Sequence, residues 1–179
     1  MIKQVLRTIA SPIMLLAFLL PITGTAHAQT VTAVPKLDAG KFIGTWYALA
    51  RYPIKREKHC LSDDVVLYAL GDKRDSFQVV TSCQIKDGNS DFWNDKGKLS
   101  KTGDGSLKLS RIWPFTTKYW ILATGPAYEW ALVGTPNHRS LWVLSKSTVV
   151  TPEALAEIEA RAAAQGFNTA KLVRILQHN

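Results

Sequence analysis

Residues 118–146 read KYWILATGPAYEWALVGTPNHRSLWVLSK, and this stretch decides the fold. It contains three short runs rich in aromatic and β-branched residues, separated by Gly125-Pro126 and Pro136-Asn137. These pairs accept or pre-set the backbone angles of tight turns. Short apolar runs between turn residues are typical of antiparallel strands. The stretch therefore predicts three consecutive strands, at residues 118–124, 128–134 and 140–146.

The same rhythm continues toward the N-terminus, with a turn roughly every ten residues. It predicts five more strands, at residues 45–51, 64–70, 76–83, 92–100 and 106–112. Eight strands with short connections can close on themselves, and a barrel of eight is wide enough to hold one small ligand. We therefore expect an all-β protein built as an eight-stranded, antiparallel, up-and-down β-barrel.

One segment near the C-terminus breaks this rhythm. Thr151-Pro152-Glu153 combines an N-cap residue, a proline at the first helical position and an acidic first turn, and Gly166 is a typical C-terminal stop. Leu155, Ile158 and Ala162 recur at helical spacing between them, forming a narrow apolar stripe. We expect one C-terminal α-helix packed outside the barrel, then a short final strand at residues 171–176.

The first 28 residues resemble an export signal. Lys3 and Arg7 precede an apolar run from Ile13 to Leu20, and Ala26-His27-Ala28 offers small residues for cleavage. The run is shorter than the roughly 20 residues that span a bilayer. We expect residues 1–28 to be removed, leaving 29–179 as a single domain. The exported protein would lie in the periplasm, where it could associate with the periphery of the outer membrane, or outside the cell.

Charge and cysteine content narrow the possible partners. Without Lys3 and Arg7, 20 basic residues face 14 acidic ones, but they are dispersed along the chain, which argues against nucleic acid. The two cysteines, Cys60 and Cys83, favour one disulfide in an exported chain, with a catalytic or metal-binding pair as the alternative. No cysteine follows the signal, so no lipid anchor is expected.

Several segments together resemble the lipocalin family, in particular its bacterial and apolipoprotein D-like members. The segment 41–47, KFIGTWY, is similar to the opening motif of the family, and 119–124, 131–133 and 141–146 match later ones in order. The resemblance covers nearly the whole chain after residue 28. It implies that Gly44 leads into the first strand and that Trp46 plugs the closed end of the barrel.

Two positions depart from the family pattern. Gly125-Pro126 stands where the family usually has an acidic residue, so the turn at the closed end must be held differently. Lys146 replaces the arginine that usually lies across the motif tryptophan. Lysine keeps a cation–π contact with Trp46 but loses the planar fork of donors.

The lipocalin arrangement also implies which side chains line the cavity. Matching to the family selects Tyr68, Thr81, Tyr119 and Trp142, whereas Leu109 and Ile121 follow from alternation along their strands. The same alternation points Arg111 inward near the mouth. The arrangement also places Cys60 and Cys83 at the mouth, where their pairing would tie the loop after the first strand to the rim.

Basic residues surround the expected mouth. The loop after the first strand carries Lys55, Arg56, Lys58 and His59, and His138-Arg139 follows the seventh strand. They are either solvated loop charges or a receptor for an acidic head group. Cations above an apolar well would suit a fatty acid or a lysophospholipid. This predicts binding, storage or transport of a small hydrophobic or amphipathic ligand, and it leaves the oligomeric state open.

Two other functions are compatible with the sequence. An enzyme that acts on a lipid could use His59 with Asp63 or Asp64, but no known metal-ligand or nucleophile motif is present, so we expect no catalytic residues, metal or cofactor. Alternatively, Trp113 and Phe115 could dock on a membrane or a protein while the barrel is filled. A cavity too small for a ligand would favour this interaction module.

Overall fold

The computed structural model describes residues 29–178 apart from residues 74, 111 and 113. The predicted signal peptide, Arg111 and Trp113 therefore lie outside the described residues. Within the described part of the chain, no helix is both long enough and apolar enough to cross a membrane.

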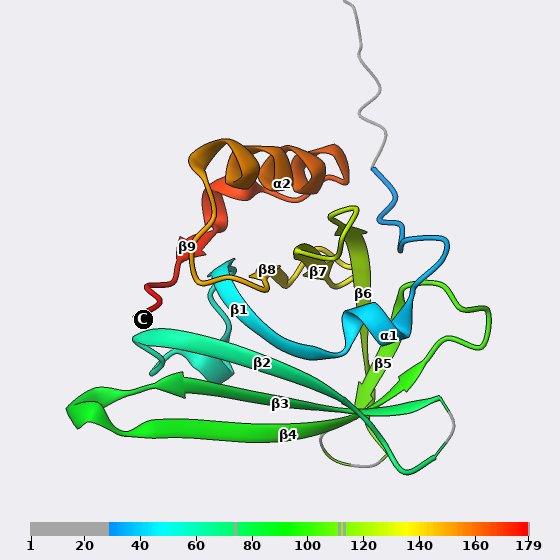
Figure 1. Ribbon diagram of the computed structural model, residues 1–179, viewed down its shortest axis with the longest axis horizontal. Helices are drawn as coiled ribbons and strands as arrows, with labels where there is room; N and C mark the ends of the chain where they lie inside the picture. The colour runs from blue at the N-terminus through cyan, green and yellow to red at the C-terminus, as the bar shows by residue number, and fades with distance from the viewer. Residues whose placement is uncertain (1–28, 74, 111, 113, 179) are drawn as a thin grey trace, which may run out of the picture.

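Eight antiparallel strands close into a barrel, which confirms the predicted fold (Figure 1). Each strand pairs with the next, and the eighth pairs with the first. The strands are β1 (Gly44–Arg51), β2 (Ser62–Leu70), β3 (Ser76–Gln84), β4 (Ser90–Leu99), β5 (Ser106–Ser110), β6 (Thr117–Thr124), β7 (Trp130–Gly134) and β8 (Leu141–Ser145). The short elements are α1 (Ala39–Phe42), η1 (Lys55–Glu57), η2 (Lys86–Gly88) and η3 (Thr169–Lys171).

The predicted helix is α2 (Pro152–Ala164), and its N-cap Thr151 accepts a hydrogen bond from the Ala154 amide at 3.2 Å. The final strand is shorter than predicted: β9 (Val173–Arg174) pairs with the end of β1. The difference arises because Asn168 caps the 3₁₀ turn η3, which occupies the start of the predicted strand.

The helix covers only one side of the barrel, and this divides the hydrophobic core in two. An inner cluster fills the barrel, and an outer cluster joins β1, β7 and β8 to Ile158 and Ala162 of α2. Every residue of β7 and β8 is buried because these strands have protein on both faces, whereas β3 alternates regularly. The outer face of β3 and β4 lies away from α2 (Figure 1).

The closed end of the barrel is built around Trp46, which is fully buried. Its indole Nε1 donates to the Phe42 carbonyl at 2.8 Å, and Lys146 Nζ lies 4.0 Å from the ring centroid. The same ammonium donates to the Ile43 carbonyl. Gly44 has a φ of +108°, a conformation that side chains disfavour, and a Cβ there would lie 3.3 Å from Lys146 Nζ.

The departure at Gly125-Pro126 is compensated by Glu129. Its carboxylate accepts from the Ala127 amide at 3.0 Å, and its carbonyl accepts from the Lys146 amide at 2.9 Å. The turn is therefore held by an acidic residue that directly precedes β7.

Candidate functional site

The disulfide lies at the open end of the barrel. Cys60 and Cys83 are bonded, with their Cα atoms 5.5 Å apart, which confirms the predicted pairing. The bond ties the segment after η1 to the end of β3. Among the described residues, the group with metal-ligand spacing is His59, Cys60 and Cys83, and the disulfide occupies both of its sulfur atoms.

A cavity of about 40 Å³ lies inside the barrel below this rim. Five of the side chains predicted to line it do so: Tyr68, Thr81, Leu109, Tyr119 and Trp142. The rings of Tyr119 and Trp142 pack with their centroids 5.2 Å apart. Burial raises the pKa of both tyrosines, so their hydroxyl groups are neutral near neutral pH.

Ile121 is a correction, because it faces the barrel interior without reaching the cavity. It is fully buried, and its backbone is hydrogen-bonded to Gly105 and to Val34 of the N-terminal segment. These contacts place it near the closed end. The alternation of side chains along the strand predicted correctly that Ile121 faces inward, but it did not predict how close to the closed end the residue lies.

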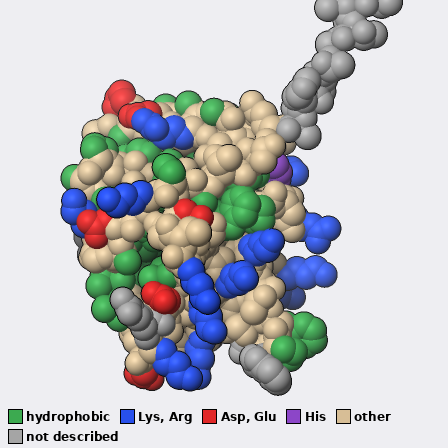
Figure 2. All heavy atoms as spheres, turned by 90° about the vertical axis from the view of Figure 1, so that its right-hand side faces the viewer, with side chains coloured by type: hydrophobic (Ala, Val, Ile, Leu, Met, Phe, Trp, Pro, Cys, Tyr) green, Lys and Arg blue, Asp and Glu red, His purple; other side chains and the backbone are tan. Residues whose placement is uncertain are grey.

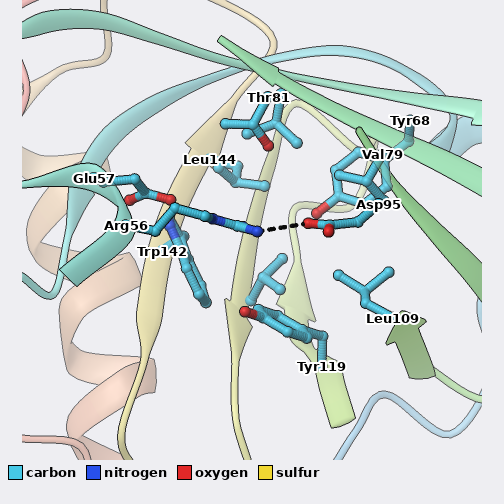
Figure 3. Close-up of a pocket in the computed structure, with 12 residues that line it drawn as sticks. Arg56, Glu57, Tyr68, Val79, Thr81, Asp95, Leu109, Tyr119, Trp142 and Leu144 are labelled. Atoms are coloured by element: carbon cyan, nitrogen blue, oxygen red, sulfur yellow. Dashed lines mark hydrogen bonds and ion pairs between the residues drawn. The ribbon is translucent and has the colours of Figure 1, made fainter. Parts of the chain in front are cut away.

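The upper wall of the cavity is polar. Arg56 turns from η1 into the barrel, and its Nη1 lies 2.9 Å from Asp95 Oδ2. Its guanidinium also lies 4.8 Å from the ring centroid of Trp93, within the range of a cation–π contact. In Figure 3, Arg56 extends across the labelled side chains toward Asp95. Arg56 therefore contributes a charged group between the apolar interior and the mouth.

A group of three charged residues lies beside the pair of Arg56 and Asp95. Arg51 Nε lies 2.7 Å from Asp64 Oδ2 and 2.9 Å from Glu57 Oε2, and all three side chains are almost completely buried. Burial raises the pKa of Glu57 to about 7, Arg51 opposes the shift and Asp64 reinforces it. Burial also raises the pKa of Asp64. The rim therefore holds a carboxyl group that titrates near neutral pH.

Four buried side-chain polar atoms have no hydrogen-bond partner among the described residues. They are Glu57 Oε2 and Asp64 Oδ1 in the cluster around Arg51, and Asp95 Oδ1 and Trp93 Nε1. Leaving a buried polar atom unpaired typically costs about 1–3 kcal/mol. Asp95 also lines the cavity, so its unpaired oxygen is a candidate contact for a donor group on a bound molecule.

The predicted ring of basic residues is only partly present. Lys55, Lys58 and His59 are exposed, and His59 Nε2 lies 2.8 Å from Asp91 Oδ2. His138 is also a correction: its ring packs on Phe167 and contacts the Gln165 carbonyl, which fastens the loop to the end of α2. Of the loop cations singled out from the sequence, Arg56 is the one that lines the cavity.

The buried carboxylates were not predicted. The buried carboxylates are Glu57, Asp64 and Asp95. Asp64 lies 13 residues from its partner Arg51, and Asp95 lies 39 residues from its partner Arg56, so no local sequence pattern predicts these ion pairs. One signal was available: Asp95 shares the inward side of β4 with Trp93 and Gly97. An acid between two inward positions predicts a buried, paired charge.

The pairs considered for an enzyme do not form. His59 contacts Asp91, Asp63 contacts His178 at 2.8 Å, and Asp64 is paired with Arg51. The site is instead a narrow apolar well with a charged rim, the form of a binding site.

This geometry agrees with the comparisons. Residues 37–177 match the lipocalin-like domain family, and the chain belongs to the lipocalins. This family binds small hydrophobic ligands, and its members are generally binding proteins rather than enzymes.

The chain is 32% identical over 151 residues to the outer membrane lipoprotein Blc of Citrobacter freundii, covering 82% of this chain and 83% of the relative. It is 31% identical to Blc of Escherichia coli K12 over 150 residues, with the same coverage. Insecticyanin from the tobacco hornworm Manduca sexta has a similar fold, with a TM-score of 0.65 at 18% identity over 83% of this chain and 85% of that one. The protein is therefore a bacterial lipocalin.

Proposed function

We propose that this lipocalin binds, stores or transports a single-chain amphiphile, a fatty acid or a lysophospholipid, with the tail in the barrel and the head at Arg56. The proposal rests on the kinds of side chain that line the cavity. Val66, Val79, Leu109, Val133 and Leu144 join the three aromatic residues on an apolar wall, and Arg56 stands above them. Each methylene that the tail buries would contribute about 0.8 kcal/mol.

The size of the cavity requires a movement on binding. A volume of about 40 Å³ holds only a few water molecules, whereas ligand sites usually measure about 300–1,000 Å³. Arg56 belongs to a loop and its side chain is 28% exposed, so it can swing outward without disturbing a strand. An acidic head group would then replace Asp95 as its partner, through a charge-assisted hydrogen bond.

Trp142 provides the test of this site. Trp142→Leu shortens one wall, and losing about 50 Å² of contact should weaken binding of a fluorescent fatty acid about ten-fold. Trp130→Leu is the matched control, because Trp130 is equally buried but belongs to the outer cluster. Titrations of both variants should separate them. Equal affinities in the two folded variants would remove Trp142 from the site.

We also propose that the chain is exported, with residues 1–28 removed and without a lipid anchor. The export signal and the disulfide support export. The names of the Blc relatives describe lipoproteins, whereas the two cysteines here are joined to each other. Cell fractionation and the intact mass of the purified protein test both statements. A mass increased by acyl chains would contradict the absence of an anchor.

The small cavity also favours a second candidate function, an interaction module with a filled barrel that contacts a membrane surface. Phe115, one of the two aromatic residues proposed for this contact, is 76% exposed. Wild-type protein that binds no fatty acid or lysophospholipid at any concentration would favour this function over the first.

A further inference from the structure

A row of lysines crosses the outside of the barrel. In the sheet register, Lys98 of β4 faces Lys108 of β5, and Lys108 faces Lys118 of β6. All three are exposed, as is Lys96, two residues from Lys98 on the same face. We call these four residues the lysine wall. Neighbouring strands lie about 4.8 Å apart, so the charges are close together.

No aspartate or glutamate occupies an outward position on the strands that carry this row. The neighbouring strand β3 carries none either, Asp95 points inward, and Asp91 contacts His59 at the mouth end. Among the described residues, none of the four lysines has a salt bridge. Like charges directly opposite each other destabilise a sheet. The folded chain therefore carries an electrostatic cost that an anionic partner would relieve.

Exposed apolar side chains border the lysine wall toward the mouth. Phe92 lies on the outer face of β4 and is 74% exposed, and Ile112 and Phe115 are 67% and 76% exposed. The Phe115 amide donates to the Ile112 carbonyl at 2.9 Å, so both belong to one tight turn before β6. Figure 2 shows Lys and Arg side chains gathered on the lower half of one face, with exposed hydrophobic side chains at its edge.

We propose that the lysine wall docks on a membrane surface rich in anionic phospholipid, with Phe115 and its apolar neighbours inserted between the head groups. Basic side chains are attracted to such a surface, and aromatic side chains enter its interface. Exposed apolar side chains beside a cationic face favour a lipid surface over an acidic protein, because a membrane interface takes up both kinds of side chain. Docking on a membrane is separate from ligand binding in the barrel, and it rests on the second candidate function, for which the lysine wall supplies the surface.

Vesicle sedimentation tests the proposal. Purified protein is mixed with vesicles of equal parts phosphatidylglycerol and phosphatidylcholine, or of phosphatidylcholine alone. We expect binding to the anionic vesicles, weakened by salt, and little binding to the neutral ones. Replacing Lys98, Lys108 and Lys118 together by glutamine should weaken binding about 100-fold. The melting temperature of this variant should not fall, because repulsion in the sheet is relieved.

The control removes the same charge elsewhere. Lys36, Lys41 and Lys171 are exposed and lie outside β3–β6, so their joint replacement by glutamine should leave vesicle binding within a few-fold of wild type. Phe115→Ser should abolish the binding that remains in high salt. Fatty-acid titration of each variant keeps this result separate from the barrel site. Equal weakening by the two triple variants, or equal binding of wild type to both vesicles, would overturn the proposal.

Discussion

Glu57 shows how a single buried residue can make the rim depend on pH. It is 3% exposed and shares Arg51 with Asp64, so one arginine faces two carboxylates. Keeping both charged in a dry environment is unfavourable, and burial raises the pKa of Glu57 to about 7. The carboxyl therefore takes up a proton at a pH where exposed glutamates are ionised.

The sign of the stability effect follows from this pKa. Because it lies above the ordinary value of 4.5, the folded chain binds the Glu57 proton more tightly than the unfolded chain does. The stability gained is complete below the ordinary value and is lost as the pH rises through about 7. Urea denaturation should show a free energy of unfolding that falls between pH 5 and pH 8, by up to about 3 kcal/mol from this group.

Glu57→Gln should flatten that fall, because the amide does not titrate. Asp64, whose pKa is also raised, remains in both proteins, so the difference between them reports Glu57 together with its coupling to Asp64. Glu153→Gln, on the exposed first turn of α2, serves as the control and should retain the wild-type dependence. An unchanged pH dependence in Glu57→Gln would contradict the assignment.

Lys146 is the second residue whose role can be measured. Lys146→Met removes the contact with the Trp46 ring and the hydrogen bond to the Ile43 carbonyl, and should lower the free energy of unfolding by about 1–2 kcal/mol. Lys146→Arg restores a cation over the ring and should recover most of the loss. Lys171→Met, at an exposed position, is the control. If Lys146→Met is as stable as wild type, the packing of Trp46 at the closed end does not need the ammonium group.

At the scale of elements, the disulfide holds the segment that carries Arg56 and Glu57. Cys60 and Cys83 enclose a sequence separation of 23 residues, and closing such a loop contributes about 3 kcal/mol in the chain-entropy account. The double substitution Cys60→Ala with Cys83→Ala should lower the free energy of unfolding by about this amount. Ser82→Ala, on the outer side of the same strand, is the control. A loss below the experimental error would show that the loop is held by its ion pairs alone.

The strands were predictable because their signal is local. A period of two residues and turn residues at each end were enough to place Leu109 and Trp142 inside the barrel. The end of β5 at Ser110, two residues before the predicted end, reflects the tight turn at Ile112, which apolar character alone does not show. Arg111 belongs to that segment, lies outside the described residues and stays a prediction.

The charged rim could not be predicted in the same way. Arg56 lies in a loop, where side-chain direction has no period, and its partner Asp95 is 39 residues away. Burial of such groups is favourable only when both members of a pair meet, so neither residue alone carries the signal. The closed barrel brings Arg56 and Asp95 together, and this pairing exists only in the folded chain.

At the scale of the whole molecule, the barrel encloses a cavity, and the ion pair between Arg56 and Asp95 lies on the side of the cavity toward the mouth. In the proposed binding mode Arg56 leaves Asp95, and the free energy of breaking that pair lowers the affinity of every ligand. A fatty acid recovers part of this cost because its carboxylate can take Arg56 as a partner. An alcohol of equal chain length recovers less.

The double variant Arg56→Gln with Asp95→Asn removes both charges together and leaves no buried ion unpaired. The long-chain alcohol should therefore bind more tightly than it does to wild type, while the fatty acid loses its charged partner and gains less or binds more weakly. The ratio of the two affinities should shift toward the alcohol by about ten-fold, or about 1.4 kcal/mol. Competition titrations against one fluorescent lipid measure both ligands in the same assay. Lys55→Gln, an exposed neighbour of Arg56, is the control and should leave the ratio unchanged. A ratio that is the same in the double variant and in wild type would mean that ligands enter without displacing Arg56, and that the head group is held elsewhere on the rim.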